Sequence, residues 1–202
     1  MGQDFTAIIG YGLGPAVLPT LPHLLSPQES PRLAHALGRV GQVCGRASDA
    51  DALWYDCNFD VADPEALWPW DWMAHLDNPN GFFIDALGPG AASIGFAIRW
   101  WDFVANPAIA GAVRAACREL ARTLGGPPRA LYVADRWDIA SDVQVQRPLD
   151  QIIAAMYERA GPPVPTFDAL LLNDRRDGDI GWAYYVDDFS SWPDGDEPPS
   201  AR

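Results

Sequence analysis

The sequence predicts an α+β fold: a single domain whose mixed or mostly antiparallel sheet has about seven strands, with about three helices. Apolar residues make up 49% of the 202-residue chain, which is enough for a hydrophobic core. Segments with strand periodicity and segments with helix periodicity follow one another, joined by tight turns and by helical crossovers. No linker divides residues 1–189, which we expect to be one globular domain, and residues 190–202 are expected to form a disordered acidic tail.

The N-terminal elements are a strand and a capped helix. Phe5–Leu13 is predicted to be a strand that ends in glycines, and the three prolines of Pro15–Pro22 exclude a regular helix there. Ser30 and Pro31 are typical of the N-cap and first position of a helix, which we expect to continue to about Val40.

Leu53–Val61 has the clearest strand pattern in the chain, because apolar and polar residues alternate strictly along it. A period of two sends alternate side chains to opposite faces of a sheet. One face should therefore meet the core, and the other should carry Trp54, Asp56, Asn58 and Asp60.

The middle of the chain predicts a hairpin and a long helix. Gly81–Leu87 and Ala92–Trp100 are expected to be strands joined by a turn at Gly88–Gly90, with a helix as the alternative for Ala92–Trp100. Asn106 followed by proline is a strong helix start, and Gly125 is expected to end that helix.

Three further strands and one helix are expected towards the C-terminus. Arg129–Trp137 is the next predicted strand, and Pro148 begins a helix that ends at Gly161. Phe167–Leu172 and Ile180–Val186 are predicted to be a closing pair of strands.

The charge is strongly negative and unevenly distributed. The formal net charge is −13, from 27 acids and 14 bases, and every base is an arginine. Such a balance disfavours nucleic acid and anionic membranes as partners, whereas a basic protein would be attracted. Between Arg46 and Arg99 there is no base but there are nine acids: Asp49, Asp51, Asp56, Asp60, Asp63, Glu65, Asp71, Asp77 and Asp85.

The chain shows neither a signal peptide nor an apolar run long enough for a membrane span, so we expect a soluble, cytoplasmic protein. Its three cysteines are widely spaced, which fits reduced thiols rather than disulfides. The isolated residues His23, His35 and His75 lack metal-ligand spacing, and we expect no metal.

No motif for a cofactor is present. Gly10, Gly12 and Gly14 follow a strand, as in a dinucleotide-binding loop, but Pro15 stands where that loop needs its third spaced glycine. We therefore expect a strand-ending turn and no cofactor. A nucleophile elbow of the form GxSxG is absent as well.

Carboxylates leave an enzymatic alternative open. Pairs of acids near predicted strand ends could perform acid–base chemistry on a glycosidic bond, and tryptophans could stack on sugars. The alternative function is therefore a carboxylate-dependent hydrolase or a carbohydrate-binding protein, for which the candidate residues are Asp135, Asp138, Asp187, Asp188, Trp68, Trp70 and Trp72.

Arg114, Arg118 and Arg122 recur every four residues on the predicted helix after Asn106. They lie opposite its apolar residues, so we expect them on a solvated helix surface.

The favoured interpretation is a non-enzymatic protein-binding module whose acidic face engages a basic partner. A tryptophan beside carboxylates on a rigid strand suits recognition of a basic protein surface, since the aromatic ring anchors and the acids steer. Immunity proteins and specific chaperones resemble this chain in charge and size alone. The candidate binding residues are Trp54, Asp56, Asn58, Asp60, Asp187 and Asp188.

Overall fold

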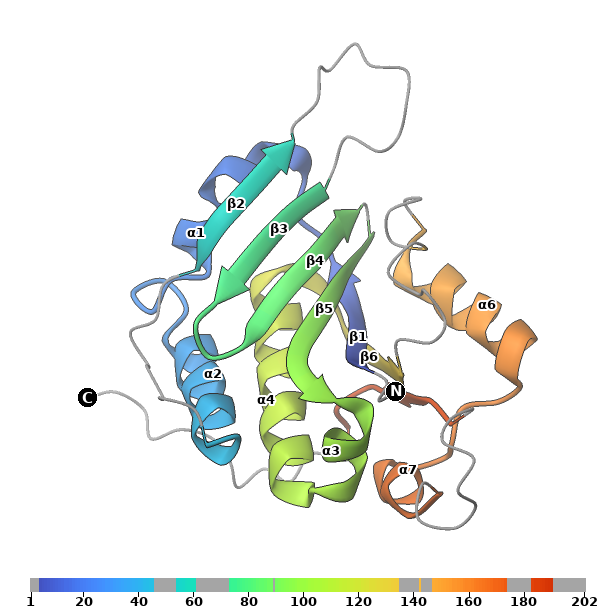
Figure 1. Ribbon diagram of the computed structural model, residues 1–202. Helices are drawn as coiled ribbons and strands as arrows, with labels where there is room; N and C mark the ends of the chain where they lie inside the picture. The colour runs from blue at the N-terminus through green and yellow to red at the C-terminus, as the bar shows by residue number, and fades with distance from the viewer. Residues whose placement is uncertain are drawn as a thin grey trace.

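A single antiparallel sheet of seven strands organises the computed structural model, which describes residues 4–45, 54–60, 73–88, 90–134, 142, 147–173 and 183–190 (Figure 1). The strand order is β2-β3-β4-β5-β1-β6-β7, and every neighbouring pair is antiparallel. The predicted α+β class and mostly antiparallel sheet are therefore confirmed. The strands are β1 (Asp4–Tyr11), β2 (Tyr55–Asp60), β3 (Met73–Asn78), β4 (Phe82–Gly88), β5 (Gly90–Arg99), β6 (Gly125–Ala134) and β7 (Tyr185–Asp187).

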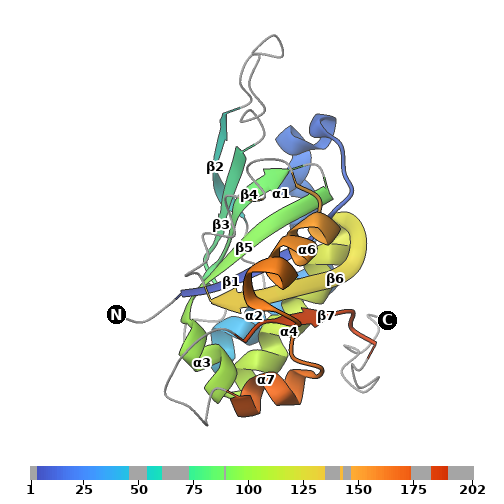
Figure 2. The same ribbon diagram turned by 90° about the vertical axis from the view of Figure 1, so that its right-hand side faces the viewer.

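Helices lie on both sides of the sheet. In Figure 1 the long helices α2 and α4 lie behind the strands, and α6 lies at the opposite end of the sheet from β2. Figure 2 looks from the side of α6 and shows it beside β6 and β1, away from β2 and β3. The helical elements are η1 (Pro15–Thr20), α1 (Leu21–Leu24), α2 (Pro31–Val43), α3 (Trp100–Ala105), α4 (Pro107–Thr123), α6 (Leu149–Ala160) and α7 (Phe167–Asn173).

Strand β1 contributes side chains to two hydrophobic cores, one on each face of the sheet. Its residues from Phe5 to Tyr11 are all buried, because helices cover both faces of the sheet at this point. Phe5, Ala7 and Ile9 belong to the larger core on the side of α2 and α4. Ile8 points the other way and joins a smaller core with Leu149, Ile152 and Met156 of α6.

The helix signals of the sequence act as expected. The side-chain Oδ1 of Asn106 accepts hydrogen bonds from the backbone N–H groups of Ala108 and Ile109, at 3.0 and 3.4 Å. This satisfies donors that would otherwise lack a partner in the first turn of α4. Gly125, at φ 67°, follows that helix, and Gly161, at φ 81°, follows α6, so both predicted helix ends are confirmed.

The glycines after Ile9 serve the packing of β1 against β6. A Cβ atom at Gly12 would lie 2.1 Å from the carbonyl oxygen of Gly125, and one at Gly10 would lie 2.4 Å from Cδ of Pro127. Only glycine permits so close an approach of the two backbones. The glycine-rich sequence therefore belongs to a strand contact, and the segment that follows is the short 3-10 helix η1 rather than a phosphate-binding helix.

One strand prediction is wrong. Phe167–Leu172 lies within helix α7, not in a strand. The hydroxyl of Thr166 accepts a hydrogen bond from the N–H of Ala169 at 3.1 Å, which caps the helix, and Phe167 and Leu170 bury the same face.

Four short elements were not predicted: η1, α1, β3 and α3. Helix α1 begins at Leu21, within the segment Pro15–Pro22 where no regular helix was expected, and Pro22 stands in its first turn, where proline is tolerated. Strand β3 supplies the seventh strand, and the short helix α3 follows β5 directly. The expected tail at 190–202, apart from Ser190, lies outside the residues that the structure describes, and so do five candidates for the alternative function: Trp68, Trp70, Trp72, Asp135 and Asp138.

Candidate functional site

The acidic candidates of the sequence lie on the edge strand β2, and its pairing with β3 fixes their register. Tyr55 pairs with Asp77, but Asn58 pairs with His75 and Asp60 with Met73, so the register shifts by one residue between Tyr55 and Asn58. A shift of this kind is a β-bulge, and it interrupts the strict alternation of faces.

The register places Asn58 and Asp60 on the face of the sheet that is turned away from the larger core. Leu76 belongs to that core, and the positions on either side of it in β3, His75 and Asp77, occupy the opposite face. Their partners share that face. We call the outer face of β2, β3 and β4, with positions Asn58, Asp60 and Asp77, the acidic sheet face.

Trp54 does not belong to the acidic sheet face. It is only 4% exposed and is part of the larger core, so the expectation of an outward tryptophan is wrong. The alternation that predicted an outward Trp54 assumes an unbroken strand from Leu53. Strand β2 begins only at Tyr55, after Trp54, and it contains the bulge. The indole Nε1 of Trp54 is buried without a hydrogen-bond partner among the residues that the structure describes.

None of the described helices covers the acidic sheet face. Figure 1 shows β2, β3 and β4 in front, with α2 and α4 behind them and α6 to one side. Towards the middle of the sheet, the ring of Phe83 lies over Gly95. A Cβ atom added at Gly95 would lie 1.9 Å from Cε2 of Phe83. Asp77 is half-buried, directly opposite Phe83 in the pairing of β3 with β4.

The second pair of acidic candidates, Asp187 and Asp188, lies at the other edge of the sheet, so the structure does not bring the two groups together. Asp187 is fully buried, at 0% exposure. It accepts hydrogen bonds from Nε and Nη2 of Arg114, at 2.6 and 3.0 Å, and from the N–H of Phe189 at 3.0 Å. A carboxylate engaged in this way holds the fold together and is not a contact surface for a partner.

Arg114 is likewise not on the solvated surface that its spacing predicted. It is 7% exposed, and its guanidinium carbon lies 4.2 Å from the ring centroid of Phe167, a cation–π contact. Burial acts to lower the pKa of Arg114, but the hydrogen bonds and charge of Asp187 outweigh it and raise that pKa. Asp187 of β7 and Phe167 of α7 cover α4 at Arg114, whereas the side chain of Arg122 is 51% exposed, as expected.

Two further ionisable groups lie near the ion pair of Arg114 with Asp187. The hydroxyl of Tyr132 lies 3.5 Å from Oδ2 of Asp187, and the thiol of Cys117 is fully buried. Burial raises the pKa of Cys117, and the negative charge of Asp187 raises it further. Burial also raises the pKa of Tyr132. Both groups therefore stay protonated and neutral, and Cys117 is not a reactive thiolate.

Asp188 is exposed and ionised. Hydrogen bonds from the hydroxyl and the N–H of Ser190, at 2.6 and 2.9 Å, lower the pKa of Asp188. It borders a cleft of about 490 Å³ next to α7 that is also lined by Arg114, Phe167, Asp168 and Tyr185. A carboxyl with a lowered pKa is a poor proton donor, so Asp188 does not fit the general acid of a hydrolase.

No three His, Cys, Asp or Glu side chains of the described residues gather in a way that would hold a metal ion. No helix in this part of the chain is both long and apolar enough to cross a lipid bilayer.

Sequence reasoning missed the partnership of Arg114 with Asp187, which are 73 positions apart. It also missed a small pocket between α2 and α4, which residues of both helices line, among them His35 and Glu119. No protein-family model, no curated protein and no solved structure matches this chain.

Proposed function

We propose that this protein is a binding module whose acidic sheet face engages a basic partner protein. The observation that carries the proposal is the position of that face: it lies on an edge of the sheet that no described helix covers (Figure 1). Antiparallel pairing with β3 holds Asn58 and Asp60 in a fixed register, which suits recognition by a preformed surface.

Charge supports the same partner. Strands β2, β3 and β4 all come from the stretch between Arg46 and Arg99, in which nine acids occur without a base. A face built from this stretch carries a negative potential, which accelerates encounter with a basic surface and disfavours acidic ones.

The structure narrows the set of residues assigned to binding. Trp54 and Asp187 are buried, so neither is part of the proposed interface. The proposal rests instead on Asp60 and Asp77, with Asn58 between them in register and Asp56 in the bulge.

The test is a binding titration with a defined basic probe, a fluorescein-labelled octalysine peptide, followed by fluorescence anisotropy. The variant Asp56→Lys/Asp60→Lys reverses two charges on β2. The matched control, Glu158→Lys/Asp168→Lys, makes the same change in charge at two exposed acids on α6 and α7.

We expect the β2 variant to weaken binding at least tenfold more than the control, because close charge pairs are lost only at the interface. Equal weakening by both variants would mean that only the net charge of −13 attracts the peptide, and the proposed interface would be wrong.

A further inference from the structure

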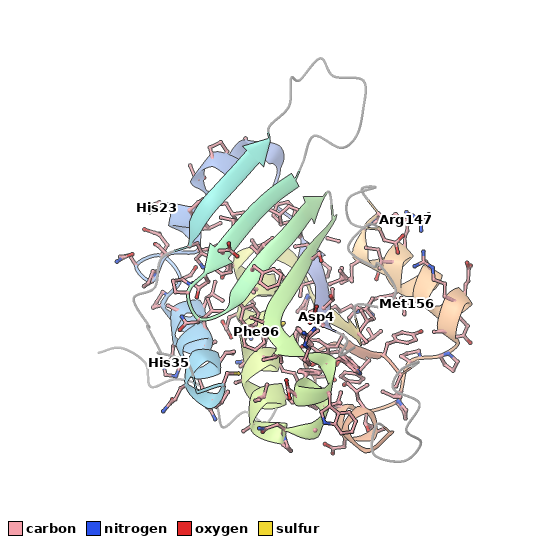
Figure 3. All side chains as sticks on the ribbon, in the orientation of Figure 1. Asp4, His23, His35, Phe96, Arg147 and Met156 are labelled. Carbon is pink, nitrogen blue, oxygen red and sulfur yellow. The ribbon has the colours of Figure 1, made fainter. Side chains whose placement is uncertain are left out.

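A cleft of about 490 Å³ lies between helix α7, strand β7 and the loop 161–166 that joins α6 to α7. Figure 3, in which Met156 marks α6, shows α7 below that helix. Strands β7 and β2 form opposite edges of the sheet, so the cleft is remote from the acidic sheet face. Its volume is within the range of about 300–1,000 Å³ that is usual for small-molecule sites.

Most of the cleft lining is apolar and is held in place by the fold. The apolar lining residues are Pro163, Val164, Pro165, Phe167, Tyr185 and Val186. The N–H of Val164 donates a hydrogen bond to the carbonyl oxygen of Tyr184 at 3.0 Å, which ties the loop to the residue before β7. The rings of Phe167 and Tyr185 are buried in the larger core. A preformed apolar wall of this kind binds the apolar part of a ligand at a low ordering cost.

Two carboxylates give the cleft a negative charge. Arg114 also lines the cleft, but its guanidinium donates two hydrogen bonds to the buried carboxylate of Asp187, so this pair contributes no net charge. Asp168 and Asp188 line the cleft as well, and both are exposed. The charge offered to a ligand is therefore that of these two acids.

Both carboxylates are available to a ligand. In the part of the chain that the structure describes, neither Asp168 nor Asp188 forms an ion pair with a base. Ser190 holds Oδ1 of Asp188 with two hydrogen bonds, at 2.6 and 2.9 Å, and so fixes the position of this carboxylate. The nearby cation Arg129 is itself paired with Asp150 at 2.9 Å.

We propose that this cleft binds a small organic cation, whose ammonium group is held by Asp168 and Asp188 and whose apolar body lies against the loop and Val186. Opposite charges attract, and the apolar surface that leaves water adds affinity. A ligand with both parts fits the lining better than a lysine-rich peptide, whose slender side chains would fill little of the apolar space. The proposed function concerns the opposite edge of the sheet, so the two proposals are independent.

The probe is tryptamine, titrated into the ¹⁵N-labelled full chain, with tryptophol as its neutral analogue and indolepropionate as its anionic analogue. The largest amide shift changes are expected at Asp168, Val186 and Asp188. Tryptamine should bind about tenfold more tightly than tryptophol, because two exposed ion pairs are added to the same apolar contact. Indolepropionate should bind most weakly. Shift changes centred outside the cleft, or equal affinities for tryptamine and tryptophol, would overturn the proposal.

A charge variant tests the two carboxylates. Asp168→Asn/Asp188→Asn should weaken tryptamine binding about tenfold and leave tryptophol binding unchanged, since only the ion pairs are lost. The control Glu29→Gln/Glu158→Gln removes the same charge from two exposed acids outside the cleft and should change tryptamine affinity less than twofold. Equal weakening of tryptamine binding by both variants contradicts the assignment to the cleft. An equal loss of tryptophol binding in the first variant also contradicts it, because the acids would then act on the shape of the cleft and not through charge.

Two competing occupants are distinguished as well. If octalysine shifts the amides of Asp168 and Asp188 at a lower concentration than tryptamine does, a basic peptide is the better ligand and the assignment to a small cation fails. Arg175 and Arg176 follow α7 in the sequence. The variant Arg175→Gln/Arg176→Gln should leave tryptamine affinity unchanged, whereas a manyfold gain would identify the chain's own arginines as the occupant.

Discussion

Replacing Arg114 by methionine is expected to destabilise the fold strongly, because it leaves the carboxylate of Asp187 buried without its charged partner. Asp187 is fully buried, and the guanidinium of Arg114 donates two hydrogen bonds to it. Removing one member of a buried ion pair costs about 3–5 kcal/mol in the free energy of unfolding. Among the described residues, the hydrogen-bond donors that would remain at the carboxylate are the N–H of Phe189 and the hydroxyl of Tyr132, and both are neutral.

The matched control is the exposed ion pair of Arg129 with Asp150, whose side chains are 48% and 77% exposed. Water screens such a pair, so Arg129→Met should cost less than about 1 kcal/mol. Urea unfolding at pH 7, followed by circular dichroism, measures both variants. The double variant Arg114→Met/Asp187→Leu should recover at least half of the loss, since no buried charge is left unpaired. If Arg114→Met costs no more than Arg129→Met, the buried-pair reasoning is refuted.

Further predictions concern the glycine contact and alkaline pH. Gly12→Ala should lower the free energy of unfolding by more than about 2 kcal/mol, because the methyl group would meet the carbonyl oxygen of Gly125. Gly14→Ala should leave it almost unchanged, because the space around Gly14 is open. Thermal melting compares the two variants. Burial raises the pKa of Cys117 and of Tyr132, so the folded state keeps protons that the unfolded chain releases. Stability should therefore be complete below about pH 8.5 and fall as the pH rises above it, and urea titrations of Cys117→Ala should show a shallower fall between about pH 8.5 and 10.

Local signals in the sequence were sufficient for most of the fold. The cap at Asn106 and the glycine after α4 act within a few residues of themselves, so the sequence alone locates that helix. The hairpin of β4 and β5 was likewise predictable, because its strands are joined by a turn of glycines.

Elements that depend on distant contacts were not predictable. Phe167–Leu172 is a short apolar run, and periodicity cannot distinguish a strand from a helix over six residues. Its packing against α4, through the ring of Phe167 and the guanidinium of Arg114, belongs to the tertiary structure. Strand β3 lacks a clean alternation and is defined by its pairing with β2 and β4.

The candidate site shows the same limit. Alternation located strand β2 and its acidic residues, but it could not reveal a bulge that depends on pairing with β3. The outward position of Trp54 was therefore inferred from a strand that is not continuous. Spacing along α4 suggested a solvated Arg114 because nothing in that helix indicates that β7 and α7 cover it.

A nuclear magnetic resonance titration tests the central claim most directly. Octalysine peptide is added to the ¹⁵N-labelled full chain, and the backbone amide shifts are followed. Binding at the acidic sheet face predicts the largest changes at Asn58, Asp60 and the amides of β3, with none in α2 or α4. Changes spread evenly over all exposed acids, or centred on the cleft beside Asp188, would contradict the account.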